Sequence, residues 1–154
     1  IENRKGCSLL GIRQKKTDFE FSVKMLYNPI MQGGQAGISL FQKDNNYFTF
    51  TVEKNREKHL LKLLLKERKK EPVVIHQTFI KSYNGSITFK VISENNSYNF
   101  YYSLDNGTSF NSFIKTGFDK ILSKGYTGAY MGLYTTTSVR DLKEFADFDW
   151  VTVD

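Results

Sequence analysis

Alternation of apolar and polar residues predicts β-strands along most of this chain. In the segment 17–27 every second residue is apolar, and the residues between them are mostly charged or hydroxylated. The apolar residues are Phe19, Phe21, Val23, Met25 and Tyr27. Because successive side chains point to opposite faces of a strand, this period of two describes a strand with one buried face. Further strands are predicted at 35–42, 47–53, 73–79, 86–93, 97–104, 127–135 and 145–153.

Turn-forming residues separate these segments at regular intervals. They lie at 28–29, 33–34, 44–46, 83–85, 95–96 and 105–107, and most are Asn, Asp or Gly. These residue types tolerate the positive φ angles of tight hairpin turns. One helical turn is predicted at 118–122. About ten short strands with turns between them, and no alternation of strands with helices, indicate an all-β sandwich or barrel.

The segment 54–70 fits two periods. Five leucines among many Lys and Glu residues have the pattern of an amphipathic helix that ends before Pro72. Leu61, Leu63 and Leu65 also fit the period of a strand. Because every neighbouring segment is predicted as a strand, we interpret this segment as a strand that follows a turn near 54–58.

The last thirty residues combine glycine with aromatic side chains. Glycines at 125, 128 and 132 alternate with tyrosines at 126, 130 and 134. Glycine is expected where a backbone bends or comes close to another segment. In the closing strand, the period predicts one face with Phe148, Trp150 and Thr152. The other face then carries Asp147, Asp149, Val151 and Val153.

Composition narrows the class of protein. A length of 154 residues fits one domain, 1–154, and an aromatic content of 15% favours strands. The net charge of +6 arises largely in 4–16 and in 54–70, where Glu is interspersed, and no nucleic-acid-binding motif accompanies it. We therefore interpret the basic residues as a solvated face, with no nucleic-acid partner. No apolar run reaches the ~18 residues of a membrane span, and the lone Cys7 predicts no internal disulfide.

Two groups of carboxylates are candidates for chemistry. Asp147 and Asp149 are expected on one face about 6.5 Å apart, a spacing compatible with acid–base catalysis or with Ca²⁺. Nothing else assembles with them, so we favour a structural role and assign no catalytic residue and no metal site. The segment 103–110 resembles the Asp-box hairpin of sialidases, in which the Asp accepts backbone N–H groups of its own turn.

Three stretches, in order along the chain, resemble one known family. They are L-L-G-I-R-Q-K-K-T-D-F-E-F at 9–21, Q-A-G-I-S-L-F-Q-K-D-N-N-Y-F at 35–48, and Y-T-G-A-Y-M-G-L-Y with A-D-F-D-W at 126–150. The set resembles the C-terminal concanavalin A-like β-sandwich of glycoside hydrolase family 43, the β-xylosidases and α-arabinofuranosidases. Ile12 departs from the pattern, since the family often has Arg there.

The resemblance implies a jelly-roll sandwich of two antiparallel sheets that is not itself catalytic. It also implies a partner, the five-bladed propeller of the same protein, whose sugar pocket the sandwich helps to close. By position, Tyr126 and then Tyr130 are the expected contacts with a plant cell-wall oligosaccharide. We expect no cofactor. A structural calcium ion is left open, with Asp147 and Asp149 as its candidate ligands.

The extent of the protein leaves alternatives open. The chain starts at Ile1 rather than Met, and the family normally has further strands before Leu9, so we expect a fragment of a larger glycoside hydrolase. We expect a bacterial periplasmic or secreted location rather than a cytoplasmic one. An independent carbohydrate-binding module or lectin-like domain is the alternative, and a small hydrolase that uses Asp147 or Asp149 is the third hypothesis.

Overall fold

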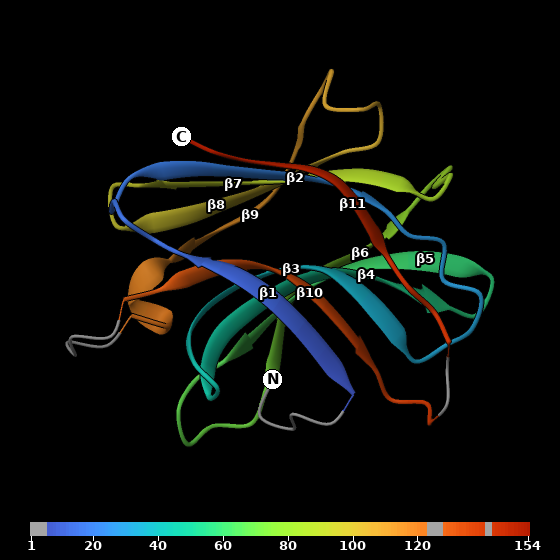
Figure 1. Ribbon diagram of the computed structural model, residues 1–154, viewed down its shortest axis with the longest axis horizontal. Coiled ribbons are helices and arrows are strands. Elements are labelled where there is room, and N and C mark those ends of the chain that lie inside the picture. The colour runs from blue at the N-terminus through green and yellow to red at the C-terminus, as the bar shows by residue number, and fades with distance from the viewer. Residues whose placement is uncertain (1–5, 123–127, 141–142) are drawn as a thin grey trace.

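Two antiparallel β-sheets pack face to face in the computed structural model (Figure 1). The structure describes residues 6–122, 128–140 and 143–154. One sheet has six strands: β1 (Cys7–Arg13), β3 (Gly34–Lys43), β4 (Asn46–Asn55), β5 (Lys58–Lys66), β6 (Val73–Ile80) and β10 (Tyr130–Thr137). The other has five: β2 (Phe19–Leu26), β7 (Ser86–Glu94), β8 (Ser97–Ser103), β9 (Asn111–Gly117) and β11 (Asp147–Val153). The predicted sandwich of two antiparallel sheets is thus confirmed.

The strand order places the first and last strands at one margin of the sandwich. The six-stranded sheet runs β1-β10-β3-β4-β5-β6 and the five-stranded sheet runs β11-β2-β7-β8-β9. A single turn of 3-10 helix, η1 (Phe118–Lys120), lies where a helical turn was predicted. No helix within the described ranges has the length and apolar character needed to cross a membrane.

Aromatic side chains from both sheets build the core. The alternating residues of β2 face inward as predicted, and Val23 and Met25 are fully buried. Phe50 of the six-stranded sheet meets rings of the other sheet edge-on, with centroids 5.0 Å from Phe89 and 5.5 Å from Phe100. Such edge-to-face pairs add to the free energy of burying the ring area.

The ambiguous segment is a strand. Leu61, Leu63 and Leu65 of β5 are buried in the core, as a period of two requires. On the opposite face, Lys62 pairs with Glu53 of β4 at 2.7 Å. The turn before β5 is shorter than predicted, since β4 continues to Asn55 and Arg56 adopts a positive φ of 54°.

Two strands at sheet margins were not predicted. β1 and β9 have mostly exposed or partly exposed side chains, so neither carries a clear alternation of apolar residues. Each is held by backbone pairing with one neighbour, β10 and β8 respectively. Local patterns do not reveal such strands, because pairing with a neighbour stabilises them more than burial of their own side chains does.

A β-bulge in β11 overturns the predicted faces of that strand. Phe148 pairs with Met25 and Trp150 pairs with Lys24, which leaves Asp149 as the extra residue. Phe148 therefore packs against the core, whereas Trp150 lies on the outer face with Lys24. The prediction that Phe148, Trp150 and Thr152 share one face is wrong, because an inserted residue reverses the alternation after it.

Candidate functional site

Tyr130 belongs to a row of side chains on the outer face of the six-stranded sheet. The register places Tyr130 of β10 between Arg13 of β1 and Phe41 of β3. Phe41 in turn pairs with Tyr47 of β4, and Tyr47 pairs with Lys66 of β5. Their sequence neighbours Leu40, Phe48 and Met131 point into the core, so these five residues face outward. We refer to Arg13, Tyr130, Phe41, Tyr47 and Lys66 as the aromatic row.

The accessible part of the aromatic row lies toward β1. Tyr130 and Phe41 stack with ring centroids 5.2 Å apart and an interplanar angle of 24°. Tyr47 and Lys66 are buried, each only 6% exposed, and the Lys66 ammonium donates to carbonyl oxygens of the β5–β6 loop. Arg13 is exposed, while Tyr130 and Phe41 are half-buried. A ligand can therefore reach a guanidinium and two aromatic rings.

The backbone beside the aromatic row is tightly held. The Gln14 N–H donates to the Ala129 carbonyl at 2.9 Å, and the Gln14 side chain donates to the Lys16 carbonyl at 2.8 Å. At Gly128 an added Cβ would lie 3.0 Å from Arg13 Nε, so glycine leaves room for the guanidinium. Tyr126, the first predicted sugar contact, falls outside the described residues.

Most of the other tyrosines are structural. Tyr27, Tyr98 and Tyr134 are 4%, 0% and 6% exposed. Burial raises the pKa of the Tyr98 and Tyr134 hydroxyls, as expected for phenols removed from water. The alternation of aromatics in the sequence therefore reports the core more than a binding surface. Tyr101 is half-buried in β8, on the five-stranded sheet.

Both candidate calcium ligands lie on β11, and one of them is in an ion pair. The Asp149 carboxylate pairs with the Lys24 ammonium at 3.0 Å. Asp147 pairs in register with Leu26, at the start of β11. Within the described ranges, no group of three or more His, Cys, Asp or Glu side chains is placed to hold a metal ion. A structural calcium ion stays a prediction.

The Asp105 carboxylate is bound within its own hairpin. It accepts hydrogen bonds from Ser103 Oγ at 2.6 Å, from the Ser109 N–H at 2.9 Å and from Ser109 Oγ at 2.6 Å. Hydrogen bonds from the Ser103 and Ser109 side chains lower the pKa of this carboxyl to about 2. Phe110 follows, with its ring centroid 4.3 Å from Lys90 Nζ. The Asp-box resemblance thus describes a structural turn, as predicted.

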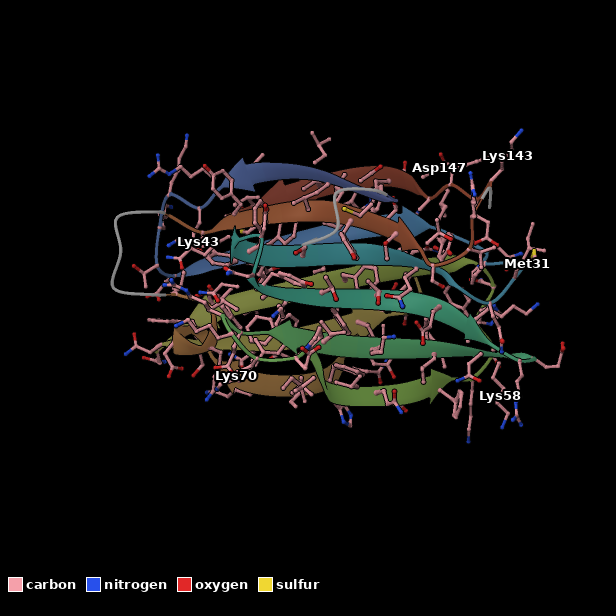
Figure 2. All side chains as sticks on the ribbon, turned by 90° about the horizontal axis from the view of Figure 1, so that it is seen from below. Met31, Lys43, Lys58, Lys70, Lys143 and Asp147 are labelled. Atoms are coloured by element: carbon pink, nitrogen blue, oxygen red, sulfur yellow. The ribbon has the colours of Figure 1, made fainter. Side chains whose placement is uncertain are left out.

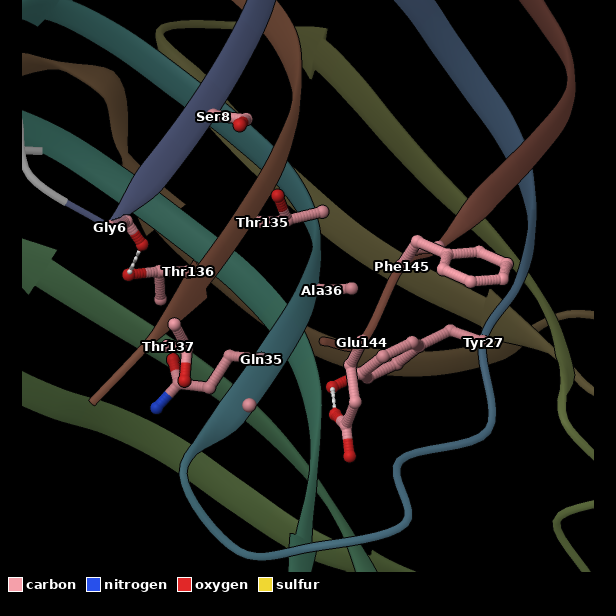
Figure 3. A pocket seen from close by; sticks show the side chains of 12 residues that line it. Gly6, Ser8, Tyr27, Gln35, Ala36, Thr135, Thr136, Thr137, Glu144 and Phe145 are labelled. Carbon is pink, nitrogen blue, oxygen red and sulfur yellow. Dashed lines mark hydrogen bonds between the residues drawn. The ribbon is translucent and has the colours of Figure 1, made fainter. Parts of the chain in front are cut away.

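Glu144 is a carboxylate with a structural role that the sequence pattern does not reveal. Its Oε1 accepts from the backbone N–H groups of Ile30 and Met31 at 2.9 and 3.0 Å, and its Oε2 accepts from the Tyr27 hydroxyl at 2.9 Å. Figure 3 shows Glu144 and Tyr27 in a hollow of ≈230 Å³ that Thr135 also lines. Glu144 thereby ties the β10–β11 connection to the β2–β3 loop. Because the partners are over a hundred residues apart, no local motif marks them.

Comparison with known proteins identifies the family. The family of β-xylosidase C-terminal concanavalin A-like domains matches residues 1–154, the whole chain. The chain belongs to this family. Among curated proteins, this chain is 27% identical over 170 residues to a xylosidase/arabinosidase of Butyrivibrio fibrisolvens. That alignment covers 100% of this chain and 30% of the relative.

Solved structures share the fold. The domain matches a xylan β-1,4-xylosidase from Bacillus halodurans C-125 with a TM-score of 0.85 and 17% identity, over 95% of this chain and 29% of that one. It matches the GH43 BlXynB protein of Bacillus licheniformis with a TM-score of 0.82 and 22% identity, over 95% of this chain and 29% of that one. The chain therefore spans under a third of the length of these relatives, and it corresponds to one domain of longer GH43 proteins.

Proposed function

We propose that this chain is a non-catalytic accessory domain of a xylan- or arabinan-degrading glycoside hydrolase. In this proposal it packs against a five-bladed propeller of the same protein, and the accessible end of the aromatic row helps to shape the propeller's sugar pocket. The observation that carries the proposal is the stacked pair of Tyr130 and Phe41 beside the exposed Arg13. Aromatic rings with a nearby multiple hydrogen-bond donor suit the apolar faces and hydroxyl groups of sugars.

The carboxylates support a non-catalytic role. Glycoside hydrolysis needs two carboxyl groups about 5–10 Å apart on either side of the scissile bond. Asp105, Asp149 and Glu144 are instead bound by hydroxyl, ammonium or backbone N–H groups of the domain itself. None of the five side chains of the aromatic row is a carboxylic acid. The domain thus offers contacts for substrate and leaves acid–base chemistry to its partner.

Kinetics of the full-length protein test this role. Tyr126→Ala and Tyr130→Ala should each lower kcat/KM for short aryl-xylosides about 2- to 10-fold, since an aromatic contact is worth about 0.5–1.5 kcal/mol. Tyr101→Ala is the matched control, because it removes a half-buried tyrosine from the other sheet. If both Tyr126→Ala and Tyr130→Ala leave the kinetics unchanged, the domain does not shape the sugar pocket.

A second candidate function is that of an independent carbohydrate-binding module. Trp150 lies on the outer face of the five-stranded sheet with 37% of its surface exposed, beside the Lys24–Asp149 ion pair. An exposed indole next to charged hydrogen-bonding groups is a suitable platform for a sugar ring. Calorimetric titration of the domain with xylo- and arabino-oligosaccharides distinguishes the two functions. Binding that Trp150→Ala abolishes would favour this one.

A further inference from the structure

Apolar side chains line an open seam between the first and last strands. Leu10 and Ile12 of β1 pair in register with Leu133 and Met131, which pack against the core. Val151 and Val153 of β11 pair with Val23 and Phe21, which are core residues too. These four side chains therefore point toward the space between the sheets. Yet Leu10 is 72%, Ile12 48%, Val151 43% and Val153 41% exposed.

The seam is a continuous depression. One hollow of ≈140 Å³ is lined by Leu10, Ile12 and Val151. A second hollow of ≈700 Å³ is lined by Ile12 and Val153, and both hollows share Ile12 and Met131. Figure 2 shows β1 and β11 together along one margin of the sandwich. The two sheets thus fail to close over each other where the chain enters and leaves the fold.

One end of the seam is basic. The charged side chains that line the larger hollow are Arg13, Lys15, Lys16 and Asp154, so cations outnumber anions there. β1 and β11 are also the end strands of their sheets within the described residues, so one edge of each has no strand beside it. Exposed apolar side chains on such edge strands favour association with another polypeptide. The chemistry fits an occupant with apolar side chains along its length and acidic groups near Arg13.

We propose that the seam is the docking surface for the polypeptide that precedes residue 1 in the full-length protein. The family consists of C-terminal domains. In the Butyrivibrio relative, 70% of the length lies outside the region that this chain matches. Only six residues precede β1, so the preceding polypeptide enters the fold within about 22 Å of the seam. This inference rests on the proposed function, because it assumes that the preceding polypeptide is the hydrolase domain.

The size of the seam favours a tethered occupant over a second copy. A stable interface between separate proteins buries about 800 Å² on each partner. Four side chains that expose between 41% and 72% of their surface supply about half of that area at most. A tethered partner needs less area, because a short linker gives an effective concentration in the millimolar range.

Hydroxyl-radical footprinting of the wild-type full-length protein tests the docking. Leu10 and Ile30 are both 72% exposed aliphatic side chains, and Ile30 lies in the β2–β3 loop away from the seam. Each oxidation rate is compared with that of the same residue in the urea-unfolded protein. If the seam is covered, Leu10 should oxidise several-fold more slowly than its 72% exposure in the domain predicts. A Leu10 rate that matches 72% exposure overturns the proposal.

Three further measurements separate the remaining explanations. Leu10→Asp in the full-length protein should speed hydrogen exchange of β1 and β11 at least about tenfold. Val73→Asp should not, because Val73 is a 54% exposed residue of β6, at the opposite end of the sheet from β1. Unchanged exchange in Leu10→Asp overturns the proposal. The protein could instead have twice the mass of one chain at high concentration, with Leu10 losing its protection on dilution. That result would assign the seam to a second copy and would overturn the proposal too. A wild-type protein that hydrolyses neither aryl-xylosides nor aryl-arabinosides contradicts the proposed function, but the footprint is independent of that activity.

Discussion

Removal of the Glu144 carboxylate should loosen the end of the sandwich where β2, β3 and β11 meet. Three groups donate to it: the Tyr27 hydroxyl and the N–H groups of Ile30 and Met31. A hydrogen bond to a charged group contributes about 1.5–3 kcal/mol when the partner is buried, and much less when water can replace it. Ile30 and Met31 are 72% and 53% exposed, whereas Tyr27 is buried. We therefore expect Glu144→Ala to lower the free energy of unfolding by about 2–4 kcal/mol.

Glu144→Gln separates the charge from the hydrogen bonds. The amide oxygen can still accept from both N–H groups, and the amide nitrogen can donate to the Tyr27 hydroxyl. This variant should lose only about 1 kcal/mol, the charge-assisted part of the interaction. Glu57→Ala, which removes an acid from the exposed β4–β5 turn, should stay within about 0.5 kcal/mol of the wild type.

Urea denaturation measures these differences, and hydrogen exchange locates them. The Ile30 and Met31 amides should be protected in the wild type and should exchange freely in Glu144→Ala, while β4 and β7 keep their protection. If Glu144→Ala unfolds within about 0.5 kcal/mol of Glu57→Ala, the carboxylate does not hold the loop and our reasoning is wrong.

Three further predictions concern other parts of the fold. Gly37→Ala should lower the free energy of unfolding by about 3 kcal/mol or more, because the added Cβ would overlap the Phe50 carbonyl oxygen of β4; an unchanged melting temperature would contradict this. The Asp105 carboxyl should titrate near pH 2 in an NMR experiment. The stability that this ionised carboxylate gives the fold should be complete above the unfolded pKa of about 3.9 and should disappear between pH 4 and 2. An ordinary titration midpoint would refute the hydrogen-bonded turn. Burial, and to a lesser extent the charge of Lys54, lowers the pKa of His59. The unfolded chain therefore binds this proton more readily, and the domain should lose stability below about pH 6.5. His59→Gln should remove that part of the pH dependence, and an identical stability profile would contradict the prediction.

The hairpins are the part of the fold that local sequence predicts well. The turn at Asn95 and Asn96 has two positive φ angles, 48° and 60°, as the residue types there predict. The strands on either side place Val91, Tyr98 and Phe100 in the core, in agreement with their period of two. In the ambiguous segment, the context of neighbouring strands gave the correct interpretation, since the leucine spacing also suits a helix.

The candidate site was only partly predictable. Tyr130 stands out in the sequence because glycines flank it, but its neighbours Arg13, Phe41 and Tyr47 come from three other strands. Their adjacency depends on the strand order and the register, neither of which a local pattern encodes. The burial of Tyr47 and the exposure of Arg13 likewise depend on which strands and loops lie beside each residue in the folded domain.

The class of fold was predictable from the amino-acid sequence, because alternation and turn chemistry act over a few residues. The family was predictable as well, through ordered motifs that span the chain. Three features became evident from the three-dimensional fold alone. They are the edge strands β1 and β9, the bulge at Asp149, and the hydrogen bonds of Glu144 with Ile30 and Met31. Each of these depends on a partner far along the chain, and the free energy of such contacts appears only when the two sheets assemble.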